Sequence, residues 1–461
     1  MSRQRGQVSY FCPECGYESP RWMGFCPACG QRSPLVEAPP RGAARRGLGP
    51  SAAVSAPQEL RQVSLEDSSR STTGFPELDR VLGGGVVAGS LVLMAGEPGI
   101  GKSTLLLQVA QAQGGRKVLY VSGEESDRQV RLRAQRLDIT GEGIFFVAET
   151  EIDQVLHHLD AAQPGLGVVD SIQALYADGL PSGPGSVAQV RECTLRLMEW
   201  AKSHRVPLLI AGHVTKDGTL AGPRVLEHIV DVVLYMEGDR MGAYRLLRSV
   251  KNRFGSTNEV GVFQMGARGM EEVADPSRAL LSERQRQAVG SAIVPVLEGS
   301  RPLMMEIQAL TSPSMLAVPR RVANGIDYRR LLMLAAVLSQ RAGLRLGNHD
   351  IIANVVGGLS VSEPASDLAV CLAIASSYRN VPLEADLVCL GEVGLSGEVR
   401  AVSQLERRLR EAARLGFSRC LVSASSMDTL KGVSGLRLEA VTSLREAIQL
   451  ALPARRRKGE E

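Results

Sequence analysis

The sequence predicts an α/β protein with three parts: a small cysteine-rich N-terminal module, a domain with a central, mostly parallel sheet, and a C-terminal α+β domain. Four cysteines cluster near the N-terminus, and short β-branched runs alternate with helical patterns from about residue 71 to 265. Strand-like and helical segments resume after residue 291. With 461 residues the chain is about two to three times the usual domain size, so we expect several hydrophobic cores.

Composition excludes fibrous and membrane-spanning classes. Hydrophobic residues make up 44% and charged residues 22%, and the longest apolar runs, such as LVLMA and VPLLIA, are too short to cross a bilayer. The N-terminus, MSRQRGQVSY, has no apolar stretch typical of a secretory signal. We therefore expect a reducing, cytoplasmic location and no membrane partner. The net charge of +4 leaves the partner open.

Changes in composition place the domain boundaries. One segment rich in Pro, Gly, Ala and Arg has no hydrophobic period and is typical of a linker, and a second, polar and Arg-rich segment indicates a connector. The late runs IVDVVLYME, YRLLRSVKN and VGVFQM lack intervening helices, so the sheet should end in antiparallel strands. The expected parts are the cysteine module (1–33), linker (34–65), sheet domain (66–275), connector (276–291) and C-terminal domain with a disordered tail (292–461).

The N-terminal cysteines form two CxxC pairs separated by ten residues. The four residues are Cys12, Cys15, Cys26 and Cys29. Two such pairs can complete a closed tetrahedral shell of thiolates, which predicts a structural Zn²⁺ site whose metal supplies the folding energy of the module. Two redox dithiols or disulfides are the alternative, and the absence of a βαβ pattern here disfavours it. Tyr17, Trp22 and Phe25 are expected in a small core, with a contact surface as the other possibility.

A glycine-rich loop follows the strand SLVLMA and precedes a helical run. Its residues are Gly96, Glu97, Pro98, Gly99, Ile100, Gly101, Lys102, Ser103 and Thr104, which match G-x-x-x-x-G-K-[ST]. In this setting backbone N–H groups surround phosphates, Lys102 reaches the β- and γ-phosphates, and Ser103 supplies an oxygen to Mg²⁺. The pattern predicts ATP and Mg²⁺ as cofactors, and the strand-loop-helix context disfavours a chance glycine turn.

Acidic residues follow two neighbouring strands. Asp170 ends the strand LGVVD and suits Mg²⁺ coordination, whereas Glu124 and Glu125 follow KVLYVS and could polarise the attacking water. We prefer Glu124 as the base, with Glu125 as the fallback and a solvated helix cap as the alternative for the pair. His213 follows VPLLIA, where it could sense the γ-phosphate or be purely structural.

Several stretches resemble one family. The start of a RecA-type ATPase core is similar to the stretch TGFPELDRVLGGGVVAGSLVLMAGEPGIGKSTLLLQVA. The second strand of that core, with its catalytic glutamate, resembles YVSGEES, which places the glutamate at Glu124. The signature of RadA (Sms) bacterial DNA-repair ATPases resembles KNRFG (251–255). The resemblance implies a DNA-dependent ATPase that moves on single-stranded DNA as a homo-hexameric ring and promotes branch migration of recombination intermediates. It also implies a RecA-type recombinase as partner.

Two cations of the KNRFG motif are candidate catalytic residues. Lys251 and Arg253 end the strand YRLLRSV just before a glycine turn, so both side chains can project from one edge. Cations displayed in this way suit an arginine-finger role, which stabilises the transition-state charge. The resemblance implies that they act on ATP held by a neighbouring subunit and contact DNA. A solvated basic turn is the alternative.

The C-terminal region resembles the proteolytic domain of Lon through LGEVGLSGEVRAVSQLERRLREA. The positions of the Ser/Lys dyad of that family fall on Ala365 and Glu406, and a one-residue slip to Ser366 finds no partner lysine. An oligomerisation and binding scaffold is therefore favoured over an ATP-dependent protease. The remaining alternative is a protein-remodelling ATPase whose activity ignores DNA.

Basic clusters in the same region are candidate phosphate contacts, although a solvated helix face is the default expectation for each. They are Arg320 with Arg321, Arg329 with Arg330, and Arg407, Arg408 and Arg410.

Overall fold

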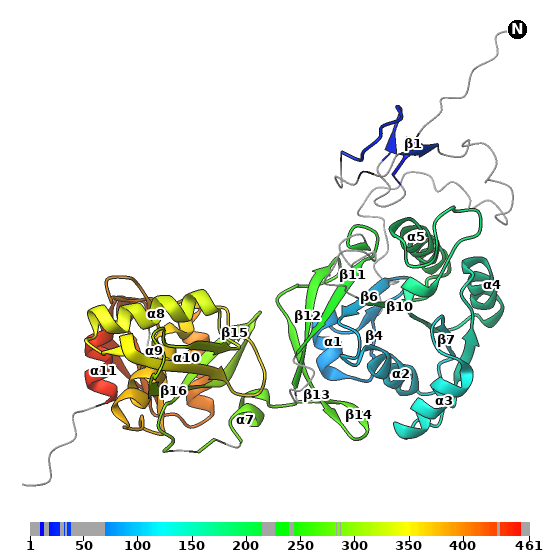
Figure 1. The fold of residues 1–461 in the computed structure, drawn as a ribbon. Coiled ribbons are helices and arrows are strands. Elements are labelled where there is room, and N and C mark those ends of the chain that lie inside the picture. The colour runs from blue at the N-terminus through cyan, green and yellow to red at the C-terminus, as the bar shows by residue number, and fades with distance from the viewer. Residues whose placement is uncertain are drawn as a thin grey trace, which may run out of the picture. The chain divides into compact units, whose positions relative to one another are not determined.

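The computed structural model describes most of the chain (Figure 1). The described residues are 10–12, 18–27, 32, 35–37, 70–213, 226–238, 244–282, 284–285, 287–430 and 434–452. They fall into two compact units. The first lies within Met1–Glu237, Leu247–Thr257 and Gly266–Met270, and the second within Gly238–Leu246, Asn258–Met265 and Glu271–Glu461. None of the described helices is long and apolar enough to span a membrane.

A large sheet organises the first unit, and residues 244–246, 260–265 and 271–272 of its strands fall within the ranges of the second unit. Its strands are β6 (Leu91–Gly96), β7 (Val118–Ser122), β8 (Ile144–Ala148), β9 (Leu166–Asp170), β10 (Leu208–His213), β11 (Val232–Glu237), β12 (Tyr244–Asn252), β13 (Val260–Gly266) and β14 (Gly269–Glu272). Among the described residues the order is β14-β13-β12-β11-β6-β10-β9-β7-β8. The pairs from β11 to β8 are parallel, which confirms the expected mostly parallel sheet.

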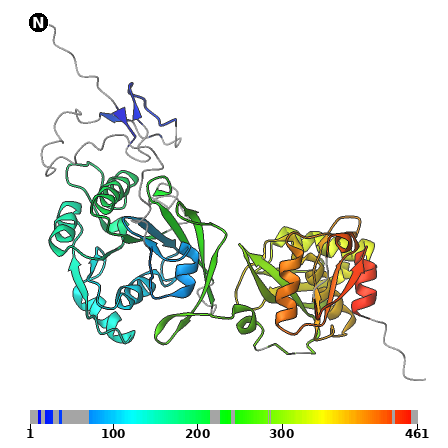
Figure 2. The same ribbon diagram turned by 180° about the vertical axis from the view of Figure 1, so that it is seen from behind.

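Helices cover both faces of this sheet (Figures 1 and 2). They are α1 (Pro76–Leu82), α2 (Lys102–Ala112), α3 (Asp127–Arg136), α4 (Ile152–Ala162) and α5 (Val187–His204). The unit also contains the short helix η2 (Ile172–Ala174) and a separate antiparallel ribbon of β4 (Arg70–Ser71) and β5 (Val86–Val87). Apolar residues of α4 and α5 share one core cluster with alternate residues of β6, whereas α2 lies outside that cluster. β6, β7 and β9 are buried along their whole length, as expected for strands covered on both faces.

The second unit is a mixed sheet with helices. Its main strands are β15 (Ser291–Glu298), β16 (Arg301–Pro313), β17 (Arg321–Asn324), β18 (His349–Val355), β19 (Leu387–Cys389), β22 (Arg419–Ser423) and β23 (Arg437–Val441), in the order β17-β18-β16-β15-β19-β22-β23 within the described part. β20 (Glu392–Val393) and β21 (Val399–Arg400) form a ribbon. The helices are α7 (Pro276–Leu280), α8 (Tyr328–Arg341), η3 (Leu346–Asn348), η4 (Pro364–Ser366), α9 (Asp367–Arg379), α10 (Leu405–Arg414), η5 (Ala424–Thr429) and α11 (Leu444–Ala451). The apolar residues of α9 are buried in the core of this unit, so the other elements pack around this helix.

The N-terminal module has a small sheet and a small core. β1 (Tyr10–Phe11) lies between β2 (Glu18–Ser19) and β3 (Val36–Glu37). Cys12, Cys26 and Leu35 fill the described core. Trp22 and Phe25 are 60% and 56% exposed, so the expectation that they lie in the core was wrong, because the thiols and Leu35 occupy that space. Tyr17 lies outside the described residues.

A buried ion pair fastens α10 to the rest of the second unit. Arg408, expected on a solvated helix face, is fully buried. Its two Nη atoms lie 2.5 and 2.6 Å from the Glu363 carboxylate oxygens, and it also donates to the backbone oxygens of Pro295 and Ser403. With every nitrogen of the guanidinium hydrogen-bonded, the charge is compensated inside the protein.

We predict that Arg408→Ala destabilises the second unit by about 3–5 kcal/mol, because the change leaves the Glu363 carboxylate without its buried partner. The matched control is Arg410→Ala on the same helix, which removes an exposed i,i+4 pair worth about 0.2–0.5 kcal/mol. Urea unfolding of the full chain measures both variants. Equal shifts of the midpoint would show that Arg408 has no special structural role.

Candidate active site

The glycine-rich loop joins the end of β6 to the start of α2. Gly99 and Gly101 have φ angles of 79° and 118°, in the left-handed region that glycine tolerates and bulky residues avoid. Gly101 precedes the first turn of α2, and no side chain caps that helix. The N–H groups of this first turn therefore point towards the loop, an arrangement that suits a phosphate group.

Strand register brings the ends of four strands to the same edge of the sheet. Gly96 of β6 is paired with His213 of β10, and Ser122 of β7 is paired with Asp170 of β9. β9 and β10 are themselves neighbours. Residues that follow these strands, such as Glu124, therefore lie near the loop, at the edge where ligands bind in open parallel sheets.

Lys102 is the buried cation of this edge. Its Nζ donates to the backbone oxygens of Gly96 and Glu97 at 2.9 and 3.0 Å and lies 3.2 Å from Nδ1 of His213. Burial lowers the pKa of Lys102 to about 8, although the negative charges of Asp170 and Glu124 oppose this shift. The two carboxylates therefore keep Lys102 largely protonated at neutral pH.

The structure distinguishes Glu124 from Glu125. The Glu124 carboxylate accepts a hydrogen bond from the Ser171 hydroxyl and lies 3.5 Å from Nε2 of His213. The hydrogen bond with His213 is the largest cause that lowers the pKa of Glu124 to about 2; the Ser171 bond and the Lys102 charge add to it, and partial burial opposes it. Glu124 is thus ionised at every physiological pH.

Glu125 has a different environment. Its carboxylate pairs with Arg133 of α3, and its N–H donates to the Ser122 hydroxyl at 3.0 Å. The cap of α3 is Ser126, which forms a capping box with Gln129, so neither glutamate supplies it. Of the two candidates, the structure places Glu124 beside Lys102 and turns Glu125 towards α3.

Asp170 lies buried at the end of β9, and its carboxylate accepts a hydrogen bond of 2.7 Å from the Tyr120 hydroxyl. Burial, followed by the Asp170 charge, raises the pKa of Tyr120 well above its ordinary value. We assigned no role to Tyr120 from the sequence, because an aromatic residue in the buried strand VLYVS is normally a core residue. The parallel register of β7 with β9, which pairs Ser122 with Asp170, brings Tyr120 within hydrogen-bonding distance of Asp170.

The two cations of KNRFG lie in a separate cluster. Lys251 donates to the backbone oxygens of Glu227 and Val230, and Arg253 pairs with Asp231. Burial, and then the neighbouring Arg253, lowers the pKa of Lys251. Neither cation contacts Lys102 or Glu124 among the described contacts of their own chain. The Arg253 side chain is 46% exposed and can therefore reach another molecule.

The described residues contain two of the four expected metal ligands. Cys12 and Cys26 are both fully buried, and thiolates are the donors that Zn²⁺ prefers. Cys15 and Cys29 lie outside the described residues. Within the described part, no group of three or more His, Cys, Asp or Glu residues is placed to hold a metal ion. Oxygen donors suited to Mg²⁺ are present at Ser103 and Asp170.

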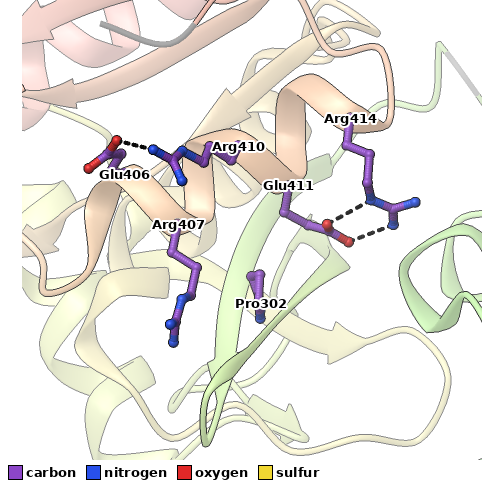
Figure 3. A pocket seen from close by; sticks show the side chains of 6 residues that line it. All are labelled: Pro302, Glu406, Arg407, Arg410, Glu411 and Arg414. Carbon is purple, nitrogen blue, oxygen red and sulfur yellow. Dashed lines mark hydrogen bonds and ion pairs between the residues drawn. The ribbon is translucent and has the colours of Figure 1, made fainter. Parts of the chain in front are cut away.

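The positions matching the Lon dyad hold no catalytic pair. Ala365 is buried in η4, and the neighbouring Ser366 donates its hydroxyl to the Glu363 backbone oxygen at 2.9 Å. Glu406 pairs with Arg410 at 2.5 Å (Figure 3). The sequence has no lysine between Ser291 and Leu430. A serine nucleophile in this segment would therefore lack its lysine base.

The arginines of α10 line a pocket of about 410 Å³ (Figure 3). The lining residues are Pro302, Glu406, Arg407, Arg410, Glu411 and Arg414. Arg410 is paired with Glu406, and Arg414 with Glu411 and Asp275. Acidic partners thus offset most of the positive charge expected to attract phosphates here.

We predict that ATP affinity falls as the pH rises above about 8. Lys102 loses its proton above its pKa of about 8, and the charged form binds phosphates better, so affinity should drop by up to about tenfold per pH unit. Equilibrium binding of a fluorescent ATP analogue between pH 7 and 10 measures this. Lys102→Arg is the control, because its guanidinium stays charged; parallel curves for the two proteins would rule out Lys102 as the titrating group.

Comparisons with known families support the three-part organisation. Family models match an AAA domain at residues 56–219, the subunit ChlI of Mg-chelatase at 329–426 and a rubredoxin metal-binding domain at 10–37. Among solved structures, a KaiC-like protein from Pyrococcus horikoshii is 22% identical, with a TM-score of 0.38, over 45% of this chain and 99% of its own.

Curated relatives match almost the entire chain. DNA repair protein RadA of Listeria monocytogenes is 46% identical over 98% of this chain and 100% of its own length. The RadA protein of Bacillus subtilis is 48% identical over 96% of this chain and 98% of its own. With identity at this level along the full length, the chain belongs to the RadA family of DNA repair proteins.

Proposed function

We propose that this chain is a DNA-dependent ATPase of homologous recombination and DNA repair. It moves on single-stranded DNA as a homo-hexameric ring in the bacterial cytoplasm and promotes branch migration of recombination intermediates. The observation that carries the ATPase proposal is the cluster of Lys102, Glu124 and His213 beside a glycine-rich loop. The names of the RadA relatives support the link to DNA repair.

The loop and its neighbours would bind ATP with Mg²⁺. Lys102 and the first N–H groups of α2 would hold the phosphates, and Ser103 and Asp170 would hold the metal. Bound Mg²⁺ neutralises charge on the phosphates. Tyr120 would help to orient the Asp170 carboxylate through its hydrogen bond to Oδ2. The two carbonyl contacts of Lys102 would be exchanged for phosphate oxygens.

Glu124 would orient the attacking water. With a pKa of about 2 it is a strong hydrogen-bond acceptor but a weak base, which suits polarisation of water more than full proton removal. His213 touches both Glu124 and Lys102, so this residue links the water-orienting group to the phosphate-binding group. Movement of either contact during hydrolysis would be transmitted through His213 to the segment after β10.

Lys251 and Arg253 would complete the site of a neighbouring subunit. Neither contacts Lys102 among the described contacts of its own chain, and the Arg253 side chain is half exposed, as a finger acting in trans requires. The Lon-like second unit would serve as the ring scaffold. Aromatic residues make up only 4% of the chain, so DNA contacts should depend mainly on backbone charge and weaken steeply with salt.

The N-terminal module would bind Zn²⁺ through Cys12, Cys15, Cys26 and Cys29. Exposed Trp22 and Phe25 favour a second candidate function, a protein-remodelling ATPase whose module recognises a protein, since exposed aromatics are common at protein interfaces. In the main proposal the same surface would face a RecA-type recombinase. The two candidates differ in whether DNA controls ATP hydrolysis.

We predict that single-stranded DNA stimulates steady-state ATP hydrolysis by this chain and that Lys102→Ala abolishes the stimulated activity. Loss of the Lys102 ammonium removes a buried phosphate-binding charge, so this variant also serves as the blank for contaminating ATPases. Colorimetric phosphate release with and without DNA, at low and high salt, measures the effect. Hydrolysis that ignores DNA would favour the protein-remodelling alternative.

We predict that Glu124→Gln lowers kcat by roughly 10²–10⁴-fold while ATP binding is kept, because the amide cannot polarise water as the carboxylate does. Glu125→Gln is the matched control on the adjacent residue, and its pairing with Arg133 predicts turnover near that of the wild type. Steady-state kinetics and ATP-analogue binding measure both. A large loss of kcat in Glu125→Gln, with near-normal turnover in Glu124→Gln, would assign the water-orienting role to Glu125 instead.

A further inference from the structure

One turn, residues 226–230, holds both cations of the KNRFG motif. The backbone oxygens of Glu227 and Val230 accept from Lys251 Nζ, and the His228 oxygen lies 3.4 Å from Arg253 Nη2. The turn is anchored by Leu226, Ile229 and Val230, which are buried in the core shared with α4 and α5. The two cations are therefore attached to a rigid part of the first unit, as a precise catalytic position requires.

Asp231 directly follows this turn and precedes β11. Its side chain is only 3% exposed, and its Oδ2 accepts a hydrogen bond of 3.2 Å from the N–H of Leu91, the first residue of β6. Its Oδ1 lies 3.1 Å from Arg253 Nη1 and 3.8 Å from Lys202 Nζ. The Asp231 backbone oxygen also accepts from the Arg253 N–H at 3.2 Å. Asp231 thus holds Arg253 by both its side chain and its backbone.

The other side of the motif is also fixed. Arg70 donates to the backbone oxygen of Phe254 at 2.5 Å and to that of Leu82 at 3.0 Å. Asn252 donates to the same Leu82 oxygen at 3.1 Å and accepts from the Phe254 N–H at 2.9 Å. The backbone on both sides of Arg253 is therefore held. Its guanidinium is bound by the Asp231 carboxylate at 3.1 Å and by the longer contact with the His228 oxygen at 3.4 Å.

We propose that Asp231 is a positioning residue that aims Arg253 at the ATP of the neighbouring subunit. The inference rests on the proposed trans role of Arg253. A guanidinium has five N–H donors in a fixed plane, so a carboxylate that binds one Nη sets the orientation of the others. Because the Arg253 side chain is 46% exposed, donors remain for a phosphate. The same carboxylate binds the first residue of β6, and β6 ends in the glycine-rich loop, so one strand connects the finger with the phosphate site of its own chain.

The test is Asp231→Asn in the full-length chain. Asparagine keeps the shape and can still accept from Leu91 N–H, but it loses the charge that binds Arg253. We expect kcat with DNA to fall by about 10²-fold, since misplacement of a catalytic group costs about that much. KM for ATP and the affinity for an ATP analogue should stay near wild type. Lys202→Ala is the matched control. The Lys202 side chain is half exposed and its ammonium lies 3.8 Å from the Asp231 carboxylate, so the variant removes a cation near Asp231 without touching Arg253, and kcat should be unchanged.

A double variant shows whether Asp231 acts through Arg253. If it does, Asp231→Asn should cause no further loss of kcat when Arg253 is already alanine. An additional loss of similar size in that background, or a normal kcat for Asp231→Asn alone, would overturn the positioning role. If Asp231→Asn fails to bind ATP, Asp231→Glu is the second variant, because it keeps the negative charge but moves the carboxylate. A normal kcat for Asp231→Glu would also overturn the positioning role of Asp231.

Failure of the broader proposal gives a different result. If Arg253→Ala itself leaves kcat unchanged, Arg253 is not a finger, and the positioning role falls with it. If Arg253→Ala lowers kcat and Asp231→Asn does not, the finger stands and only the role of Asp231 is lost. Circular dichroism of each variant confirms that the measured change comes from a folded protein.

Discussion

The parallel register of β6, β10, β9 and β7 is the constraint on which the candidate site depends. It brings the loop after Gly96, His213, Asp170 and the segment after Ser122 to one edge of the sheet. A shift of one residue in any of these pairs would reverse which side chains face the loop. The buried runs that fix this register therefore determine which groups meet at the candidate site.

Charge compensation within this edge is the second requirement. Burial lowers the pKa of Lys102 to about 8, and the charges of the nearby Asp170 and Glu124 carboxylates oppose this shift. Glu124 in turn owes its low pKa first to His213 and also to Ser171 and Lys102. Lys102 and Glu124 each favour the charged form of the other, so a change at one should shift the pKa of the other. Such coupling suits a site in which the charge on the phosphates changes during turnover.

Local sequence patterns predicted much of the fold and the members of the candidate site. The alternation of strands and helices and the glycine-rich loop are local features, and the structure has a mostly parallel sheet with the loop between β6 and α2. The sequence favoured Glu124 over Glu125 as the base but could not predict the contacts of either residue, because adjacent residues after a strand point in different directions. Only their contacts, with Ser171 and Arg133 respectively, separate them.

Long-range contacts account for what sequence reasoning missed. Asp231 binds Leu91, 140 residues away, and Arg408 binds Glu363, 45 residues away, so neither role is visible in a local pattern. Arg408 lies among other arginines of a charged helix, where exposure is the usual outcome. Trp22 and Phe25 were predicted wrongly for a related reason. Aromatic residues normally enter a core, but the buried residues of the described part of the small module are Cys12, Cys26 and Leu35, and both aromatic side chains are exposed.

The central claim is that each ATP site is completed by a neighbouring subunit, and subunit mixing tests it most directly. Lys102→Ala and Arg253→Ala should each be nearly inactive alone, because one lacks the phosphate-binding lysine and the other lacks the finger. Mixed at equal amounts with ATP and single-stranded DNA, they should form complete sites at roughly a quarter of the interfaces of a ring, so that activity returns. Absence of any recovery in rings shown to contain both variants would contradict the shared site.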